Sequence, residues 1–332
     1  MKICVAGSGA WGTALAMCLC KNGHDVTLWS HNPAKAEEMA KSRVNPLLKG
    51  VVLPEILKIS ADAACAEGCE IVVIASPSFA IRGVCRSIKP HLAEDVVMVS
   101  VTKGIEQGTL LRMSQIVEEE TGKAVVALTG PSHAEEVSRA VPTAVVAACP
   151  DKAKAELVQD AFMSDTLRVY TSPDVVGAEL GGAVKNVIAL CAGVTDGMGC
   201  GDNTKAMLMT RGLTEMARLG VSLGARRESF SGLSGIGDLI VTCTSQHSRN
   251  CRAGTLIGRG ASIEEAMAQI GGVVEGYYAA KSVWELAQRQ GVEMPIINAA
   301  YGVLYEGHST QDVIATLMQR RRKAESEDSA WK

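Results

Sequence analysis

The sequence predicts an α/β protein in which a doubly wound, N-terminal sheet domain is followed by an all-helical C-terminal domain. Through the first half, short β-rich runs alternate with helical patterns, and a glycine-rich turn directly follows the first run. After "TSPD" at residues 171–174 the β-rich runs stop and helical patterns continue to the end. We therefore expect one domain over residues 1–174 and a second over residues 175–332, both within the ordinary range of domain lengths.

The expected strands are short runs rich in valine and isoleucine. Several are apolar throughout, which is typical of strands in a sheet that is covered on both faces. Such strands interleaved with helical patterns indicate a doubly wound sheet. The expected strands are residues 2–6, 25–29, 70–75, 96–101, 124–129, 143–148 and 167–171.

In the second half, apolar residues recur at helical spacings of three and four. Residues 262–270 and 281–289 follow this pattern, and the charged tail 319–332 is interpreted as a solvated helix end that frays. One apolar stripe contains Met209, Leu213, Met216 and Ala217. A second stripe, expected in the core, contains Leu180, Val184, Val187, Cys191 and Val194.

Composition bounds the function. The 332 residues carry a net charge of -3, with 47% hydrophobic and 21% charged residues, so no global basic field exists for nucleic acid or an anionic membrane. The eleven cysteines contain no C-x-x-C pair, and we expect free thiols in a reducing cytosol and no metal site. Without a leader or an apolar run of ~18 residues, we expect no membrane span and a cytoplasmic protein.

Gly7, Gly9 and Gly12 have G-x-G-x-x-G spacing between a predicted strand and a predicted helix. The first glycine permits a tight turn, the second lets backbone N–H groups approach a pyrophosphate, and the third allows close helix packing. The helix dipole favours the same anion. In this context the motif predicts a Rossmann-type, dinucleotide-binding domain; the alternative is a glycine-rich turn in an unrelated α/β protein.

The second predicted strand ends in "TLWSHN", where NAD-selective proteins usually carry an acid that binds the ribose 2′-hydroxyl. No acid is present there, and Asp25 at the opposite end is interpreted as a turn residue. Ser30, His31 and Asn32 can instead accommodate a 2′-phosphate. We therefore expect NADP to bind at least as readily as NAD, although His31 also fits an ordinary exposed histidine.

Further candidates follow later strands. The loop at residues 74–78 contains small residues and a proline, where the chain would pass over a cofactor. Lys103, Gly130 and Ser132 lie at carboxyl ends of strands, the edge at which open α/β sheets bind ligands. Ser132 with Glu135 also fits a capping box, so its ligand role rests on its position.

In the helical half, Asp238 and Thr242 are four residues apart and share a helix face. Ser248, Arg249 and Asn250 precede another helix start, where serine and asparagine are natural N-caps and a guanidinium binds two phosphate oxygens at once. The segment is therefore a candidate phosphate site. A capped helix with a solvated arginine is the alternative.

Lys185 interrupts "GGAVKNV", a run otherwise built mainly from small residues. One interpretation is that small neighbours on its helix face let another molecule approach the amine closely. The other is a lysine that extends from a packed helix to water. Its face neighbours are Ala178, Gly181, Gly182, Ile188, Ala189 and Ala192.

Eight collinear motifs from residue 2 to about 323 together resemble bacterial-type NAD(P)-dependent glycerol-3-phosphate dehydrogenase. They read "GSGAWGTALA", "TKGIE", "GPSHAEEV", "LGGAVKNVIAL", "GDNTKAMLMTRGLTEMARLG", "GLSGIGDL", "TCTSQHSRN" and "VVEGYYAAK". The resemblance implies reversible reduction of dihydroxyacetone phosphate to sn-glycerol 3-phosphate, a step that begins phospholipid synthesis. It also implies a Rossmann-type domain, an α-helical domain and a homodimer.

The resemblance also implies roles by motif, with Lys185 as the proton donor and acceptor. Many members carry serine where Ala10 stands and arginine near Asn32, departures that bear on cofactor binding. The implied substrate contacts are Lys103, Gly130, Ser132, Asp238, Ser248, Arg249 and Asn250. The implied cofactor contacts, besides the glycines, are Ala10, Trp11, His31, Asn32, Lys103, Ala134, Arg249, Val273 and Glu275.

These residues suggest a mechanism. Hydride reduction of a ketone leaves negative charge on oxygen, and Lys185 can supply the proton as that charge develops. Burial should lower the pKa of Lys185, whereas Asp238 should oppose that shift and orient the amine. Lys103 would add positive potential, and Arg249 would anchor the phosphate. We take Lys185, Lys103 and Asp238 as catalytic candidates and Thr242 as a further substrate-binding candidate.

Two other functions fit parts of this pattern. Another β-hydroxyacid-type dehydrogenase, acting on 6-phosphogluconate or 3-hydroxyisobutyrate, would share the two domains and a helix-borne lysine. A non-catalytic dinucleotide sensor would share the fold. The combination of "SRN" with "GDL" argues against the first, and the presence of Lys103, Lys185 and Asp238 together argues against the second.

Overall fold

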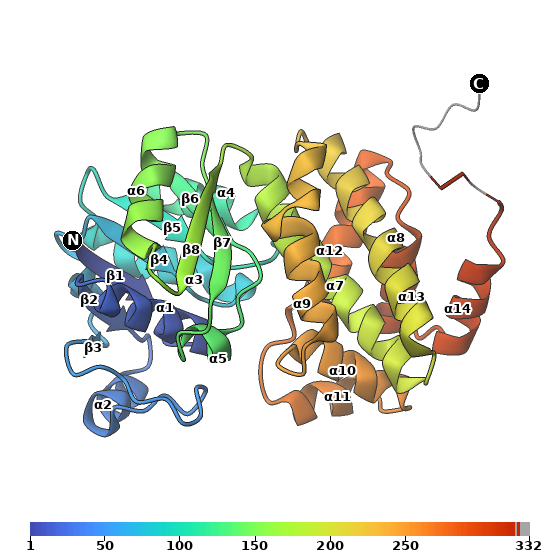
Figure 1. Cartoon of the computed structure of the whole chain (residues 1–332), viewed down its shortest axis with the longest axis horizontal. Coiled ribbons are helices and arrows are strands. Elements are labelled where there is room, and N and C mark those ends of the chain that lie inside the picture. Colours follow the sequence, from blue (N-terminus) through green and yellow to red (C-terminus); the bar gives the residue numbers. More distant parts are fainter. Residues whose placement is uncertain (323, 326–332) are drawn as a thin grey trace.

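A computed structural model describes residues 1–322, 324 and 325 of the chain. Figure 1 shows a sheet-containing lobe built from the N-terminal half and a helical lobe built from the C-terminal half. The chain passes from one to the other between the last strand, which ends at Ser172, and a long helix that begins at Val175. The expected α/β fold with a helical second part is confirmed.

Within the described residues, eight strands form one sheet in the order β3-β2-β1-β4-β5-β6-β7-β8. Neighbouring strands are parallel except β6 and β7, which are antiparallel. All the expected strands are present, and β3 is an addition that the sequence did not predict because it has three residues and only one is apolar. The strands are β1 Lys2–Ala6, β2 Asp25–Trp29, β3 Lys58–Ser60, β4 Ile71–Ile74, β5 Val97–Ser100, β6 Val125–Thr129, β7 Thr143–Ala148 and β8 Leu167–Ser172.

Helices cover both faces of this sheet, which explains why several of its strands are apolar throughout. In β1, Ile3 and Val5 belong to one buried cluster, whereas Cys4 and Ala6 belong to another. Since successive side chains point to opposite faces, each face has its own core. The helices of this lobe are α1 Ala10–Lys21, α2 Pro33–Ser42, α3 Ile81–Ile88, α4 Met113–Thr121, α5 Ala134–Val137 and α6 Lys152–Phe162.

The helical lobe is organised around α7, Val175–Gly197, which packs against α8, α9, α10 and α12. Glycines allow the closest of these contacts: a Cβ atom on Gly193 would stand 2.0 Å from the carbonyl oxygen of Cys251 in α10. The remaining helices are α8 Gly201–Ser222, α9 Asp238–Thr244, α10 Arg249–Gly258, α11 Ile263–Ile270, α12 Glu275–Gln290, α13 Pro295–Tyr305 and α14 Thr310–Met318.

Among the described residues, α7 alone is long and apolar enough to cross a membrane, but 83% of its most apolar window is buried inside the fold. It is therefore the core helix of this lobe. In the charged tail, α14 ends at Met318, and residues 319–322 are exposed and not helical; the solvated helix end that frays stays a prediction. Residues 323 and 326–332 of that tail lie outside the described residues.

Candidate active site

Four side chains from three parts of the fold meet where the two lobes face each other. The ammonium of Lys185 donates to Asp238 Oδ1 over 2.8 Å and to Thr242 Oγ1 over 2.6 Å. Lys103 donates to the other carboxylate oxygen of Asp238 over 2.5 Å and to the backbone carbonyl of Gly130 over 3.0 Å. One buried carboxylate thus holds two ammonium groups, one from each lobe.

Local structure explains why these residues converge. Lys185 lies in the middle of α7, and Asp238 opens α9, so that Thr242 follows one turn later on the same face. Lys103 and Gly130 follow β5 and β6 at the carboxyl edge of the sheet. The structure brings together the three residues expected to be catalytic.

The electrostatics of this cluster depend on burial. Lys185 is 6% exposed and Asp238 is 1% exposed. Burial lowers the pKa of Lys185 to about 8, although the charge of Asp238 opposes the shift and that of Lys103 adds to it. Burial acts to raise the pKa of Asp238, but the charges of Lys103 and Lys185 outweigh it and hold the pKa below its ordinary value. A lysine of this kind can lose its proton near neutral pH.

Other residues of the chain fill part of the space beside the small residues of α7. A Cβ atom on Gly181 would stand 2.2 Å from the carbonyl oxygen of Ser234, and one on Gly182 would stand 3.2 Å from Thr129 Oγ1 and 3.3 Å from Cγ of Lys103. Gly181 therefore allows close packing within the helical lobe, whereas Gly182 allows residues of the sheet lobe to pack against α7 near Lys185.

The glycine-rich turn has the geometry that a dinucleotide requires. Gly7 has a φ of +136°, and a Cβ atom there would stand 2.2 Å from the carbonyl oxygen of Ala75; a Cβ atom on Gly12 would stand 2.1 Å from the carbonyl oxygen of Gly7. A Cβ atom on Gly9 would meet no other atom within 4 Å, and no side chain caps the N–H groups at the start of α1. Open space at a helix N-terminus fits a pyrophosphate.

Some candidate cofactor residues lie beside this turn. Ala10 and Trp11 pack with the buried residue Ala134 in one apolar cluster. His31 and Asn32 are exposed after β2, and the Asn32 side chain caps α2 by accepting from the N–H of Lys35 over 3.1 Å. Ser30 is buried, and its hydroxyl accepts a hydrogen bond from Ser8 Oγ over 2.9 Å, so it is placed to support the turn.

Two sequence interpretations near the sheet edge need correction. Asp25 is the first residue of β2 and forms an ion pair with Lys58 over 2.6 Å, so it is not a turn residue. Ser132 does not form a capping box with Glu135: its hydroxyl donates to the carbonyl of Gly130 over 3.0 Å, and α5 has no side-chain cap. The short turn from Gly130 is stabilised instead.

The start of α10 is as the sequence predicts. Ser248 caps the helix by accepting from the N–H of Cys251 over 3.2 Å. Asn250 is buried, donates to Asn186 Oδ1 over 2.9 Å and accepts from the N–H of Gly276 over 2.8 Å. Asn250 thereby joins α7, α10 and the first turn of α12. Asn186, which sequence reasoning did not single out, is the residue after Lys185.

Arg249 and Glu275 lie near each other at this junction. Arg249 is exposed. Its Nη1 lies 3.1 Å from the position that a Cβ atom on Gly272 would occupy, and Gly272 directly precedes Val273. Burial raises the pKa of Glu275, while hydrogen bonds from Ser78 and the charge of Arg249 oppose that rise. These residues come from α10, α12 and the loop before α12.

Sequence reasoning missed a further basic residue beside the glycine-rich turn. Lys35, in the first turn of α2, donates from Nζ to the carbonyl of Ser8 over 2.7 Å, and burial lowers its pKa. The sequence did contain a signal for Lys35, because it is a basic residue shortly after the second strand. In Rossmann-type domains, that region of the chain contacts the adenosine ribose.

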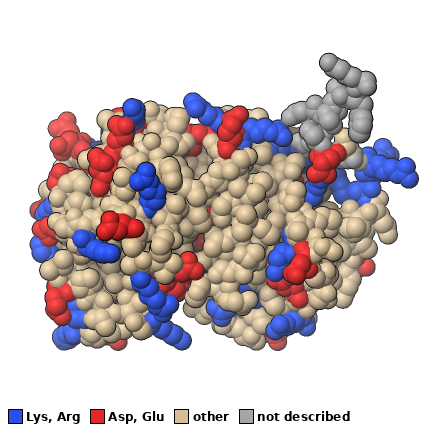
Figure 2. Space-filling model, in the orientation of Figure 1, with Lys and Arg blue, Asp and Glu red and all other residues tan. Residues whose placement is uncertain are grey.

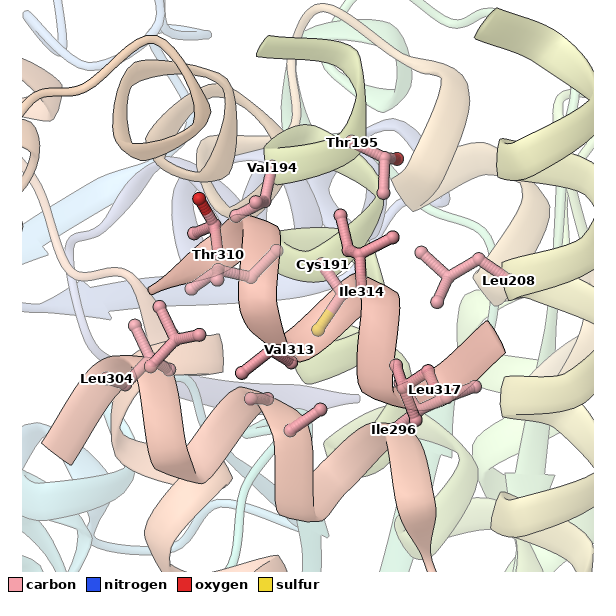
Figure 3. A pocket seen from close by; sticks show the side chains of 14 residues that line it. Cys191, Val194, Thr195, Leu208, Ile296, Leu304, Thr310, Val313, Ile314 and Leu317 are labelled. Atoms are coloured by element: carbon pink, nitrogen blue, oxygen red, sulfur yellow. The ribbon is translucent and has the colours of Figure 1, made fainter. Parts of the chain in front are cut away.

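An apolar cavity elsewhere in the helical lobe is not this site. It lies between α7, α8, α13 and α14 and is lined by residues such as Cys191, Leu208, Ile296 and Leu317, shown in Figure 3. None of the residues that line it is a candidate site residue. The described residues contain no group of three or more histidine, cysteine, aspartate or glutamate side chains that could hold a metal ion.

A Rossmann-type sheet joined to a helical lobe, with a buried lysine between them, defines a two-domain nicotinamide-dependent oxidoreductase. Comparison with known families gives the particular one. The N-terminal model of NAD-dependent glycerol-3-phosphate dehydrogenase matches residues 2–155, and the C-terminal model of that enzyme matches residues 174–315. The chain belongs to the NAD-dependent glycerol-3-phosphate dehydrogenase family.

Similar proteins agree with this assignment. The glycerol-3-phosphate dehydrogenases (NAD(P)+) of Moorella thermoacetica and of a Thermoanaerobacter species are each 49% identical to this chain; the alignments cover 99% and 98% of it, and 99% of each relative. The crystal structure of glycerol-3-phosphate dehydrogenase from Coxiella burnetii superimposes with a TM-score of 0.92 at 37% identity, covering 96% of this chain and 98% of that one.

Proposed function

We propose that the chain reduces dihydroxyacetone phosphate to sn-glycerol 3-phosphate with NADPH or NADH, reversibly, and that Lys185 is the general acid and base. NAD(P)-dependent glycerol-3-phosphate dehydrogenase activity is the activity of its family. The observation that carries the assignment of Lys185 is its set of hydrogen bonds. An ammonium has three donors; Asp238 and Thr242 accept from two of them, which leaves one for a substrate oxygen.

The proton transfer follows from this geometry. A bound nicotinamide would supply a hydride to the carbonyl carbon. The third N–H of Lys185 would donate its proton to the oxygen that becomes negative. Thr242 donates its own hydroxyl proton to the backbone carbonyl of Asp238 over 2.6 Å, so its oxygen is fixed as an acceptor for Lys185. Asp238 compensates the charge of Lys185, and Lys103 contributes positive potential beside the reacting oxygen.

The phosphate of the substrate would lie at the N-terminal end of α10. There Ser248 caps the helix and Arg249 is exposed, and a guanidinium near a helix N-terminus is suited to a phosphate. Gly130, Ser132 and Asn250 are the remaining proposed substrate contacts. Holding the non-reacting phosphate places the carbonyl beside Lys185.

The cofactor would lie along the glycine-rich turn and the facing residues of the helical lobe. The proposed contacts are Gly7, Gly9, Ala10, Trp11, Gly12, His31, Asn32, Lys103, Ala134, Arg249, Val273 and Glu275. We expect a preference for NADPH, since no acid follows β2 and Lys35 provides a positive charge beside the turn. Many members of the family carry an arginine near the position of Asn32, and in this chain Lys35 would provide the positive charge instead.

Wider features of the proposal rest on the family resemblance. The enzyme would act as a cytoplasmic homodimer, and its product would feed glycerophospholipid synthesis. The proposed boundary between the cofactor domain and the catalytic domain, after residue 174, falls at the start of α7. There Asp174 caps the helix by accepting from the N–H of Gly177 over 2.9 Å.

The test of Lys185 is steady-state kinetics of NADPH oxidation with dihydroxyacetone phosphate. Lys185→Ala should lower kcat at least ~100-fold, the usual contribution of a general acid, while the dissociation constant for NADPH changes little. Lys152→Ala, which removes an exposed lysine of α6, is the control. An unchanged kcat would remove Lys185 from the mechanism. If the wild-type chain turns over another ketone but not dihydroxyacetone phosphate, it is another β-hydroxyacid dehydrogenase. If it binds NADPH without turning over any ketone, it is a dinucleotide sensor.

A further inference from the structure

A second polar contact between the lobes involves Ser78 and Glu275. Ser78 follows β4 in the sheet lobe, and Glu275 is the first residue of α12 in the helical lobe. The backbone N–H of Ser78 donates to Glu275 Oε1 over 3.2 Å, and the Ser78 hydroxyl donates to Oε2 over 2.7 Å. Both carboxylate oxygens are therefore held by one residue of the opposite lobe.

This contact is packed against the loop that carries Lys103. A Cβ atom on Gly104 would stand 2.8 Å from Cβ of Ser78 and 3.8 Å from Glu275 Oε2. Ser78 is 7% exposed. The pair thus lies at the carboxyl edge of the sheet, where β4 and β5 end and a ligand of a doubly wound fold is expected.

Neighbouring contacts bring the same parts of the two lobes together. The ring of Phe79 lies 5.9 Å from that of Tyr278, and Gln107 Nε2 donates to the backbone carbonyl of Tyr278 over 3.3 Å. The charge of Arg249 also acts on the Glu275 carboxylate. Glu275 is therefore hydrogen-bonded to the sheet lobe through Ser78, and its carboxylate feels the positive charge of a guanidinium of the helical lobe.

We propose that Ser78 is a positioning residue for cofactor binding, because it holds the Glu275 carboxylate, and with it the first turn of α12, against the sheet edge. The inference rests on the cofactor role proposed above for Glu275 and Arg249. A dinucleotide that spans the cleft contacts the glycine-rich turn on one lobe and these residues on the other. Fixing the carboxylate in advance lowers the cost of ordering it when the cofactor binds.

The test measures NADPH binding by fluorescence titration together with steady-state kinetics. Ser78→Ala should raise the dissociation constant and KM for NADPH about tenfold, the scale expected when a hydrogen bond to a charged group is lost. The KM for dihydroxyacetone phosphate and the kcat at saturating cofactor should change less than about twofold. Ser78→Thr, which keeps the hydroxyl, should restore binding. Ser87→Ala is the matched control, because the Ser87 hydroxyl donates only within α3, to Gly83.

A double-mutant cycle separates this role from simple packing. Glu275→Gln should weaken NADPH binding by a similar factor, and the double variant should bind no more weakly than the weaker single variant, because both changes break one contact. If Ser78→Ala does not fold, Ser78→Cys, whose thiol is only a weak donor, gives the same comparison with and without Glu275→Gln. Wild-type affinity in Ser78→Ala, or factors that multiply in the double variant, would overturn the proposal. A wild-type chain that does not bind NADPH would instead overturn the proposed function, and this inference with it.

Discussion

At the scale of single residues, the role proposed for Lys185 depends on the burial of its charge. A buried ammonium loses hydration, which favours the neutral amine, and Asp238 restores part of the stability of the charged form. The result is a pKa of about 8 for Lys185, between that of a free lysine and that of a buried lysine without a partner. An acid in this range can give a proton in one direction and take it back in the other.

The pH dependence of catalysis should report this group. Reduction requires the protonated ammonium, so kcat for dihydroxyacetone phosphate should be high below the pKa of about 8 for Lys185 and fall as the pH rises through it. Oxidation of glycerol 3-phosphate requires the neutral amine and should show the opposite trend. Initial rates across pH 6 to 10 with saturating substrates would test both, and a flat profile in both directions would contradict the assignment. The Lys152→Ala control should retain the wild-type profile.

Arg249 should act mainly on substrate affinity. Because it is proposed to bind the phosphate rather than the reacting carbonyl, Arg249→Ala should chiefly raise the KM for dihydroxyacetone phosphate, by roughly 10-fold or more for a charge-assisted contact. Arg252→Ala, which removes an exposed arginine of the same helix, should leave KM near the wild-type value. An unaltered KM in Arg249→Ala would place the phosphate elsewhere.

At the scale of elements, buried carboxylates fix helix starts. Glu215 of α8 is 4% exposed and accepts from the N–H groups of Ile296 and Ile297, over 2.8 and 3.3 Å, at the start of α13. Burial raises the pKa of Glu215 to about 7, although these bonds and the charges of Arg218 and Arg320 oppose the shift. The helix start is thus held by a group that titrates near neutral pH.

This cap should make stability depend on pH. The folded pKa of Glu215 lies above its unfolded value, so its contribution is present below the unfolded pKa and is lost as the pH rises through about 7. Glu215→Gln keeps an acceptor but does not titrate. Denaturant unfolding should show the variant gaining stability relative to the wild type between pH 5.5 and 8.5, by ~2 kcal/mol, because the loss of ~1.4 kcal/mol per pH unit runs from pH 5.5 only to the folded pKa of about 7. Glu264→Gln, on the exposed face of α11, should show no such trend, and an equal difference at both pH values would refute the linkage.

Glu179 plays a comparable part between the lobes. It lies on α7, the helix of Lys185, and accepts from the backbone N–H of Ser114 over 2.7 Å and from the Ser114 hydroxyl over 2.6 Å. Arg112 also donates to it. A carboxylate from the helical lobe therefore serves the N-terminal turn of α4 in the sheet lobe, and this contact fixes α7 relative to the sheet edge.

At the scale of the whole molecule, the two lobes are joined by polar contacts that surround the proposed site. Lys103 with Asp238, Ser78 with Glu275 and Ser114 with Glu179 each pair one residue from either side. On the face shown in Figure 2, basic and acidic side chains are both scattered over the surface. The charges that matter for the proposed chemistry are therefore local ones, at the junction of the lobes.

The cysteines should have no covalent part in holding this architecture. All eleven lie within the described residues and are free thiols; Cys4 Sγ and Cys65 Sγ, for example, lie 3.6 Å apart, far beyond the length of a disulfide bond. Titration in denaturant without reductant should therefore give eleven thiols per chain, and the melting temperature should be the same with and without a reducing agent. Fewer titrated thiols, recovered by prior reduction, would contradict this.

The sequence predicted the fold and the residues that meet at the candidate site because both leave local signals. Apolar runs marked the strands, glycine spacing marked the turn, and the four-residue separation of Asp238 and Thr242 marked a common helix face. Where local signals were weak or ambiguous, the predictions failed: β3 is too short and polar to be recognised, and the Ser132 capping box was a pattern that the turn from Gly130 does not use.

Other features were decided only by the tertiary structure, because they join residues far apart in the chain. No local pattern could show that Asp238 would hold both Lys103 and Lys185, or that Ser78 would pair with Glu275. The side chains of Lys35, Glu179 and Asn186 gained partners only when strands, loops and helices packed together. The sequence by itself determined which elements form and which residues can carry charge or protons; packing determined their distances and their burial, and therefore their pKa values.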